Sequence, residues 1–123
     1  MPLKILYVED NKVNAMVMDK MLSKNDTAII IAENGKQAID IALENKLDLI
    51  LLDINLGKNQ MDGCEVLKKL QELKIAHATP VFAVTAYAMP DDEKRFKNIG
   101  FDNYFSKPVD FPLLRSEIDK LKL

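Results

Sequence analysis

Five short apolar segments alternate along this chain with five longer segments whose apolar residues recur every three or four positions. Short apolar segments without polar alternation are typical of strands buried on both faces of a parallel sheet. The longer segments are typical of amphipathic helices. The predicted strands cover residues 4–8, 27–32, 48–52, 80–84 and 102–105, and the predicted helices cover about 12–24, 36–45, 63–73, 90–99 and 110–121.

This alternation predicts an α/β fold with helices on both faces of a parallel sheet. For five strands it predicts a doubly wound (βα)5 architecture with strand order 2-1-3-4-5. The 123 residues contain no repeat or linker, so we expect one domain over residues 1–123. On a helical wheel, Val13 and Met16 fall on the outer side of the first helix. The apolar positions expected to face the sheet are Ala15, Val17, Met18, Met21, Leu22, Ala38, Ile39, Ala42, Leu43, Val66, Leu67, Leu70, Leu73, Leu113, Leu114, Ile118 and Leu121.

Composition narrows the class of protein. The chain is 48% hydrophobic and carries a net charge of −2, so no basic surplus points to nucleic acid as a partner. No apolar run reaches the roughly 18 residues that a membrane span needs. A single cysteine, Cys64, excludes an internal disulfide, and a first strand starting at Lys4 leaves no room for a signal peptide. We therefore expect a cytoplasmic protein, and we expect the one histidine, His77, to be a loop residue.

Chemistry-bearing residues collect where the predicted strands end. Glu9 and Asp10 follow the first strand, Asp53 the third, Thr85 the fourth and Lys107 the fifth. The carboxyl ends of parallel strands meet at one edge of the sheet, where open α/β folds bind ligands. Taken alone, each of these residues is an ordinary turn or cap residue. Their occurrence together at four strand ends favours a functional site.

The residue types in this set suit phosphoryl transfer. Three neighbouring carboxylates repel one another unless a cation intervenes, and Mg²⁺ prefers such oxygen ligands. An aspartate can act as the nucleophile, while a lysine and a hydroxyl stabilise the phosphoryl oxygens. The sequence therefore predicts Asp53 as the nucleophile, with Glu9 and Asp10 beside it at a Mg²⁺ site and with Thr85 and Lys107 near the transferred group.

Over its whole length the chain resembles the receiver domains of bacterial response regulators, whose fold is called CheY-like or flavodoxin-like. The stretches that carry the resemblance are Val8-Glu9-Asp10-Asn11, Leu51-Leu52-Asp53-Ile54-Asn55-Leu56, Met61-Asp62-Gly63, Val84-Thr85-Ala86 and Lys107-Pro108. The resemblance implies that Asp53 is the phosphoacceptor in two-component signalling. It also implies that Asp10 binds Mg²⁺ directly, that Glu9 helps through water, and that Asn55 offers its backbone carbonyl.

The same resemblance implies a switch. Lys107 would bind the phosphoryl group and precede a cis bond to Pro108, and Thr85 would close on a phosphoryl oxygen. Tyr104 would then move into the space that Thr85 leaves, changing the face formed by the fourth helix, the fifth strand and the fifth helix. Asn55 and Tyr87 match positions that tune the lifetime of the acyl phosphate.

The partners implied are a sensor histidine kinase or a histidine phosphotransfer protein as donor, and a downstream protein target. Val13 and Met16 are candidate docking residues for a helical donor, although exposed apolar residues are common. The chain could be a stand-alone regulator or a receiver from a hybrid histidine kinase.

Two features limit the resemblance. Gly57 stands where receivers usually have proline, and the loop between Asp53 and Gly63 is about two residues longer than usual.

A haloacid-dehalogenase-like phosphatase would also use an aspartate nucleophile and Mg²⁺, but its second acid falls here at Asn55. A flavodoxin would need a phosphate-binding loop where Glu9 and Asp10 stand. We therefore expect a receiver that is phosphorylated stoichiometrically and is not a turnover enzyme.

Overall fold

The computed structural model describes residues 3–23, 27–54, 62–76, 78–86 and 91–121. The strands are β1 (Leu3–Val8), β2 (Thr27–Ala32), β3 (Leu49–Asp53), β4 (Val81–Thr85) and β5 (Asn103–Ser106). The helices are α1 (Lys12–Leu22), α2 (Gly35–Glu44), α3 (Gly63–Glu72), α4 (Asp92–Ile99) and α5 (Phe111–Asp119). Strands and helices alternate as predicted, and most bounds agree with the prediction to within one or two residues.

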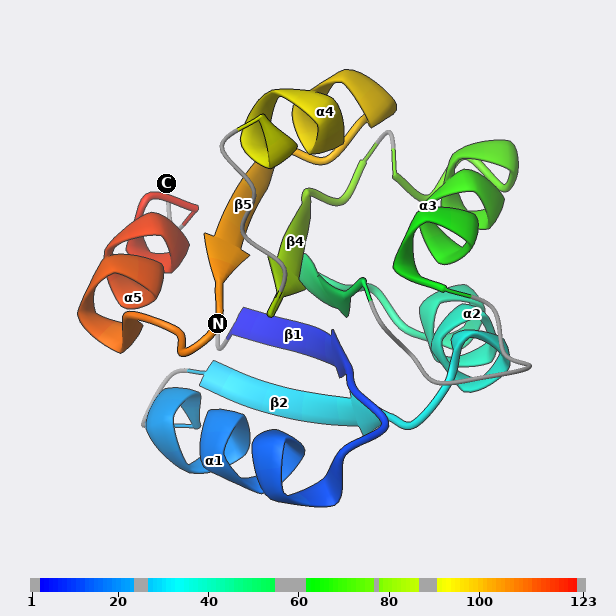
Figure 1. The fold of residues 1–123 in the computed structure, drawn as a ribbon. Coiled ribbons are helices and arrows are strands. Elements are labelled where there is room, and N and C mark those ends of the chain that lie inside the picture. Colours follow the sequence, from blue (N-terminus) through cyan, green and yellow to red (C-terminus); the bar gives the residue numbers. More distant parts are fainter. Residues whose placement is uncertain (1–2, 24–26, 55–61, 77, 87–90, 122–123) are drawn as a thin grey trace.

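The strands form one parallel sheet in the order β2-β1-β3-β4-β5, which confirms the predicted topology. Figure 1 shows α1 and α5 on one face of this sheet and α2, α3 and α4 on the other. Each face has its own apolar core, because alternate residues of a strand point to opposite faces. On β3, for example, Ile50 and Leu52 belong to the α2–α4 core, and Leu49 and Leu51 belong to the α1–α5 core.

Helix starts are fixed by side chains that satisfy free backbone N–H groups. The side chain of Asn11 accepts from Asn14 N at the start of α1, and Asp62 accepts from Glu65 N at the start of α3. Asn34 and Asp110 cap α2 and α5 in the same way. In the described part of the chain, four of the five helices therefore begin with a side-chain cap, and only Asp91, at the start of α4, makes no such hydrogen bond.

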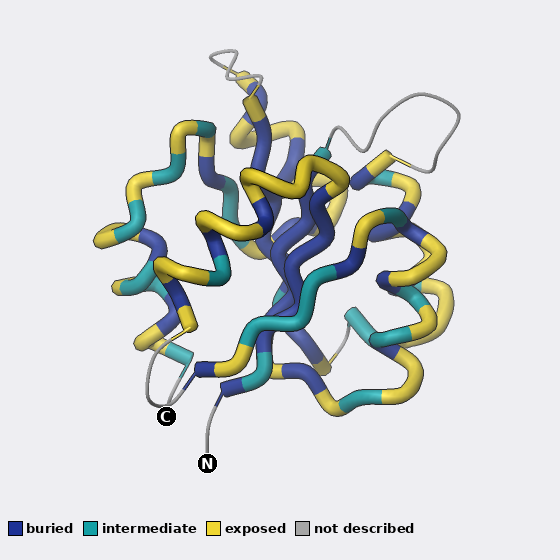
Figure 2. Tube along the Cα trace, turned by 90° about the horizontal axis from the view of Figure 1, so that it is seen from below, coloured by how far each residue is buried: buried dark blue, intermediate teal, exposed yellow. Residues whose placement is uncertain are grey.

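The inner faces of the helices are narrower than predicted. Along α1 only Ala15, Met18 and Leu22 are buried, and the outward positions of Val13 and Met16 are confirmed. The sheet-facing prediction is wrong for Val17, Met21, Leu43, Leu73 and Leu113, each more than 40% exposed. Figure 2 shows the same contrast, with buried strands in the centre and exposed outer turns on the helices.

Candidate phosphoacceptor and cation site

The acidic side chains predicted from the strand ends do come together. In the sheet register Val8 pairs with Leu52, so the residues that follow them, Glu9 and Asp53, stand side by side on neighbouring strands. Oxygen atoms of Glu9, Asp10 and Asp53 lie within 4.8 Å of one another. Glu9 and Asp53 are buried, whereas Asp10 is exposed at the rim.

Lys107 supplies the counter-charge. Its Nζ donates to Glu9 Oε1 at 2.7 Å and to Asp53 Oδ2 at 3.1 Å, and its side chain is only 20% exposed. The Lys107–Pro108 bond is cis, as predicted. Burial alone would lower the pKa of Lys107, but its hydrogen bonds and charge interactions with Glu9 and Asp53 raise the pKa above its usual value. Lys107 therefore stays protonated at neutral pH.

Glu9 is ionised in these surroundings. Burial would raise the pKa of its carboxyl group, but hydrogen bonding with Asp53 and Lys107, together with the charge of Lys107, brings the pKa below its usual value. Its Oε1 atom also accepts a hydrogen bond from the hydroxyl of Tyr7 at 3.0 Å. Burial and the nearby charge of Glu9 raise the pKa of Tyr7, so this hydroxyl remains a donor.

A cation fits the donor set of this cluster. Glu9 Oε2 is buried and has no hydrogen-bond partner among the described residues, which is costly for a carboxylate oxygen. Three carboxylates meet one lysine here, so the cluster retains negative charge. Hard oxygen ligands, a partly solvated rim at Asp10 and an unsatisfied buried oxygen suit Mg²⁺.

Thr85 and Tyr104 lie on β4 and β5, the two strands beyond β3 in the sheet order. Thr85 is fully buried at the end of β4, and its carbonyl accepts from Lys107 N at 2.8 Å. Tyr104 is half-buried on β5, and its ring stacks on Phe96 of α4 with the centroids 5.5 Å apart. Burial and the acidic residues of α4 raise the pKa of the Tyr104 hydroxyl. A contact thus links β5, next to the site, to α4 at the surface.

Gly63 allows α3 to start close against the end of β3. Its N–H donates to Ile54 O at 3.0 Å. A Cβ atom at this position would lie 2.6 Å from Asp53 O and 2.8 Å from Ile54 Cα, closer than real contacts allow. The Asp62-Gly63 pair therefore combines a helix cap with the only residue type that fits this approach.

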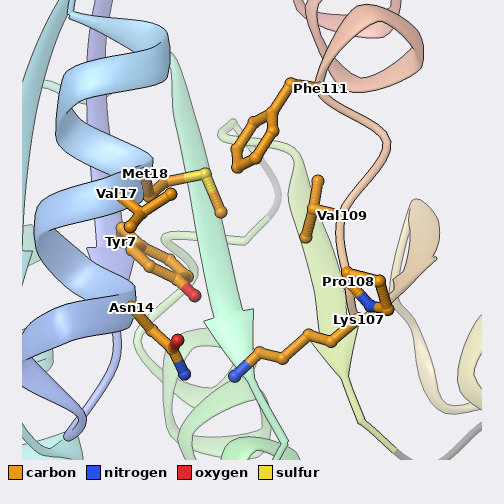
Figure 3. A pocket seen from close by; sticks show the side chains of 8 residues that line it. All are labelled: Tyr7, Asn14, Val17, Met18, Lys107, Pro108, Val109 and Phe111. Carbon is orange, nitrogen blue, oxygen red and sulfur yellow. The ribbon is translucent and has the colours of Figure 1, made fainter.

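A pocket of about 170 Å³ borders the site between α1 and the segment that joins β5 to α5. Figure 3 shows the Tyr7 hydroxyl and the Lys107 ammonium group at its polar end, and Met18, Val109 and Phe111 at its apolar end. Val17 lines this pocket, and Met21 lines a second one with Phe111. These two residues therefore border the groove between α1 and α5 rather than the sheet.

Several predicted residues lie outside the described part of the chain: Asn55, Gly57, His77 and Tyr87. Their roles stay predictions. A bulky Tyr87, for example, would shield the acyl phosphate, so Tyr87→Ala should shorten the phosphorylated lifetime. Conversely, sequence reasoning missed Tyr7. The signal was its position two residues before Glu9, because residues i and i+2 of a strand share a face.

Comparison with known proteins agrees with this geometry. Residues 5–119 match the response regulator receiver domain family. The polar-differentiation response regulator DivK of Brucella anthropi is 38% identical over 112 residues, covering 91% of this chain and 89% of DivK. The receiver domain of Francisella response regulator 1452 superposes with a TM-score of 0.87 at 26% identity, covering 97% and 95% of the two chains. A CheY-like receiver from Methanospirillum hungatei JF-1 superposes with a TM-score of 0.83 at 27% identity, covering 99% and 95%.

Proposed function

Because the chain belongs to the response regulator receiver domain family, we propose that Asp53 accepts a phosphoryl group from a phosphohistidine donor. The observation that carries this proposal is the buried cluster of Glu9, Asp10 and Asp53 with Lys107 hydrogen-bonded to two of its members. A phosphatase of the haloacid-dehalogenase type gains no support from the family match. The chain is a signalling protein of the two-component kind, and we propose that it works in the cytoplasm without sustained turnover.

In the proposed reaction a carboxylate oxygen of Asp53 attacks phosphorus and forms an acyl phosphate. The phosphorus–nitrogen bond of the phosphohistidine breaks, and its electron pair stays on that ring nitrogen. The donor leaves as neutral imidazole because its other ring nitrogen carries a proton. Lys107 Nζ, now 3.1 Å from Asp53 Oδ2, is within reach of a phosphoryl oxygen on the same carboxylate. Its fixed positive charge stabilises the negative oxygens as the bond forms.

Glu9, Asp10 and Asp53 would hold Mg²⁺, with the predicted help of the Asn55 carbonyl. When bound, the ion supplies positive charge that offsets repulsion between the phosphoryl oxygens and the carboxylates. Glu9 contributes its buried Oε2 atom, which lacks a partner among the described residues. Asp10, at the exposed rim, is the acid through which an ion from solvent would enter.

The central test is labelling with a phosphorylated donor protein. Wild type should incorporate close to one phosphoryl group per chain, and Asp53→Asn should lose at least about 100-fold in the rate of incorporation, because an amide is not a nucleophile here. Asp48→Asn, an exposed aspartate at the opposite edge of the sheet, is the matched control. An Asp53→Asn protein that still takes label would show that another residue is phosphorylated.

We propose that phosphorylation is read out through Thr85 and Tyr104. Thr85 closing on the phosphoryl group would draw β4 inward, and Tyr104 would leave its stack on Phe96, altering the α4–β5–α5 face. Thr85→Ala should still be labelled, but the backbone amide shifts of α4 and β5 should no longer change on phosphorylation. Full shift changes in that variant would exclude this route.

The outer face of α1 is the proposed docking surface for the donor. Val13 is 67% and Met16 71% exposed, and both lie in the half of α1 nearest the acidic cluster. Met16 also lines a pocket that reaches Glu9. An apolar surface beside the nucleophile suits a helical donor that must bring its phosphohistidine to Asp53.

A further inference from the structure

Tyr7 is a buried polar residue of the site to which the proposed phosphoryl transfer assigns no part. It is 1% exposed on β1, and β1 pairs with strands on both sides at this level, with Ile31 of β2 and Leu51 of β3. Strand alternation places its side chain on the same face as Glu9. Its hydroxyl donates to Glu9 Oε1 at 3.0 Å, so a rigid central strand holds this hydrogen bond.

The two oxygens of Glu9 have different surroundings. Oε1 accepts from both Tyr7 and Lys107, at 3.0 and 2.7 Å. Oε2 is buried with no hydrogen-bond partner among the described residues. The carboxylate is therefore fixed through one oxygen and leaves the other for a ligand.

The two donors to Oε1 differ in their freedom to move. Lys107 has a long side chain and stands just after β5, and Figure 3 shows it entering the pocket from the wall opposite Tyr7. In the proposed reaction Lys107 turns to the phosphoryl group. Tyr7 cannot follow, since its ring is packed in the α1–α5 core.

We infer that Tyr7 is a positioning residue whose hydroxyl holds Glu9 with Oε2 presented to the cation site and keeps it there when Lys107 leaves. This inference rests on the proposed function, because it takes the acidic cluster as the site of Mg²⁺. A hydrogen bond that orients a metal-binding carboxylate commonly raises metal affinity about 10- to 100-fold. Because Glu9 is predicted to act through water, we expect the lower end of that range.

The experiment is a Mg²⁺ titration followed by backbone amide shifts, which also measures weak dissociation constants. Tyr7→Phe keeps the ring and removes only the hydroxyl. It should raise the Kd for Mg²⁺ about tenfold. The same substitution in a Glu9→Ala background should change the Kd less than about twofold, because the residue through which Tyr7 acts is gone.

Each outcome has one meaning. A Tyr7→Phe protein that binds Mg²⁺ as tightly as wild type would overturn the inference. Equal weakening in both backgrounds would also overturn it, since that pattern belongs to a general loss of packing, which urea unfolding would register independently. A wild-type protein with no Mg²⁺-dependent shifts would instead refute the cation site itself, which is the failure of the proposed function.

Discussion

Carboxylates are used in opposite ways at the two ends of the parallel strands. At the amino edge, where the strands begin, Asp48 and Asp102 are exposed. Each carboxylate accepts a backbone N–H at 2.8 Å, from Lys4 and from Val81 respectively. Each returns its own N–H to the carbonyl of the same partner, also at 2.8 Å. At the carboxyl edge, Glu9 and Asp53 are buried and bonded to another side chain, that of Lys107.

This difference in burial and partners distinguishes carboxylates with a structural role from carboxylates that take part in binding or reaction. A carboxylate paired with backbone at a strand start has its hydrogen bonds locally satisfied and remains in contact with water. Buried carboxylates of like charge are costly unless a cation joins them, so their collection at one place needs a ligand or a reaction to account for it. The partners and burial of an aspartate, rather than its residue type, distinguish the two cases.

Lys107→Met should have the largest effect on the carboxyl edge. It removes the ammonium group that joins Glu9 and Asp53 and leaves two buried carboxylates without their cation. We expect the free energy of unfolding in urea to fall by about 3 kcal/mol, and phosphoryl incorporation to fall by at least about 100-fold. Added Mg²⁺ should recover part of the lost stability, because it binds only the folded protein.

Lys4→Met at the amino edge is the control, since among the described residues the Lys4 ammonium group donates only to Asn45 Oδ1, at 3.5 Å. Its unfolding free energy should change by less than about 0.5 kcal/mol. Equal effects of the two lysine substitutions would remove the contrast between the edges.

Gly63→Ala should affect the carboxyl edge through the backbone. The added Cβ would collide with the carbonyl oxygen of Asp53 and with Ile54 Cα, and neither atom belongs to a flexible side chain. Overpacking of this kind costs about 2 kcal/mol. We expect that loss in urea unfolding together with slower labelling, because the strand end that carries Asp53 must shift. Unchanged stability and labelling would show that α3 can withdraw freely.

Asp102→Ala should have a smaller and purely structural effect at the amino edge. It leaves the N–H of buried Val81 without its acceptor, which costs about 1 to 2 kcal/mol. The rate of phosphoryl incorporation should stay within about twofold of wild type. A large loss of labelling at unchanged stability would place this edge in the reaction and contradict the comparison.

Sequence reasoning predicted the fold because the physical signals were local. Unbroken apolar strands such as Leu49–Leu52 and the short polar residues before the helices indicated the elements, and their alternation indicated the strand order. The grouping of Glu9, Asp53 and Lys107 followed from topology alone, since parallel strands end at one edge.

The exposure of individual helix residues and the hydrogen bonds of Glu9 depend on tertiary distances, which helical wheels and residue spacings cannot predict. Val17 and Met21 are apolar and correctly spaced, yet α1 contacts the sheet along a narrow stripe and these two residues border the groove toward α5. Leu43 and Leu113 are exposed although the neighbouring residues Ala42 and Leu114 are buried, so the buried stripe of each helix is narrower than the spacing predicts. Leu73 lies just beyond the end of α3. The sequence also cannot predict that Oε1 of Glu9 accepts from Tyr7 and Lys107 while Oε2 does not, because this depends on the three-dimensional arrangement of the side chains.

The docking proposal for α1 gives the most selective test, because Met16 lies on the outer face near the carboxyl edge, whereas Met21 lies farther along α1 and borders the groove toward α5. Met16 and Met21 lie on one helix and are 71% and 43% exposed, and α1 runs from the carboxyl edge toward the amino edge. Five residues of helix separate them by about 7.5 Å.

Each Met→Ser variant should stay within about 0.5 kcal/mol of wild-type stability, because both side chains are outside the core. Met16→Ser should slow transfer from a phosphorylated donor protein about tenfold, the loss of one well-packed contact, while Met21→Ser should slow it less than about twofold. Neither should alter labelling by a small phosphodonor such as acetyl phosphate. If both variants slowed protein transfer equally, the donor would bind along the whole helix; if neither did, the apolar residues near the acidic cluster would have no part in recognition.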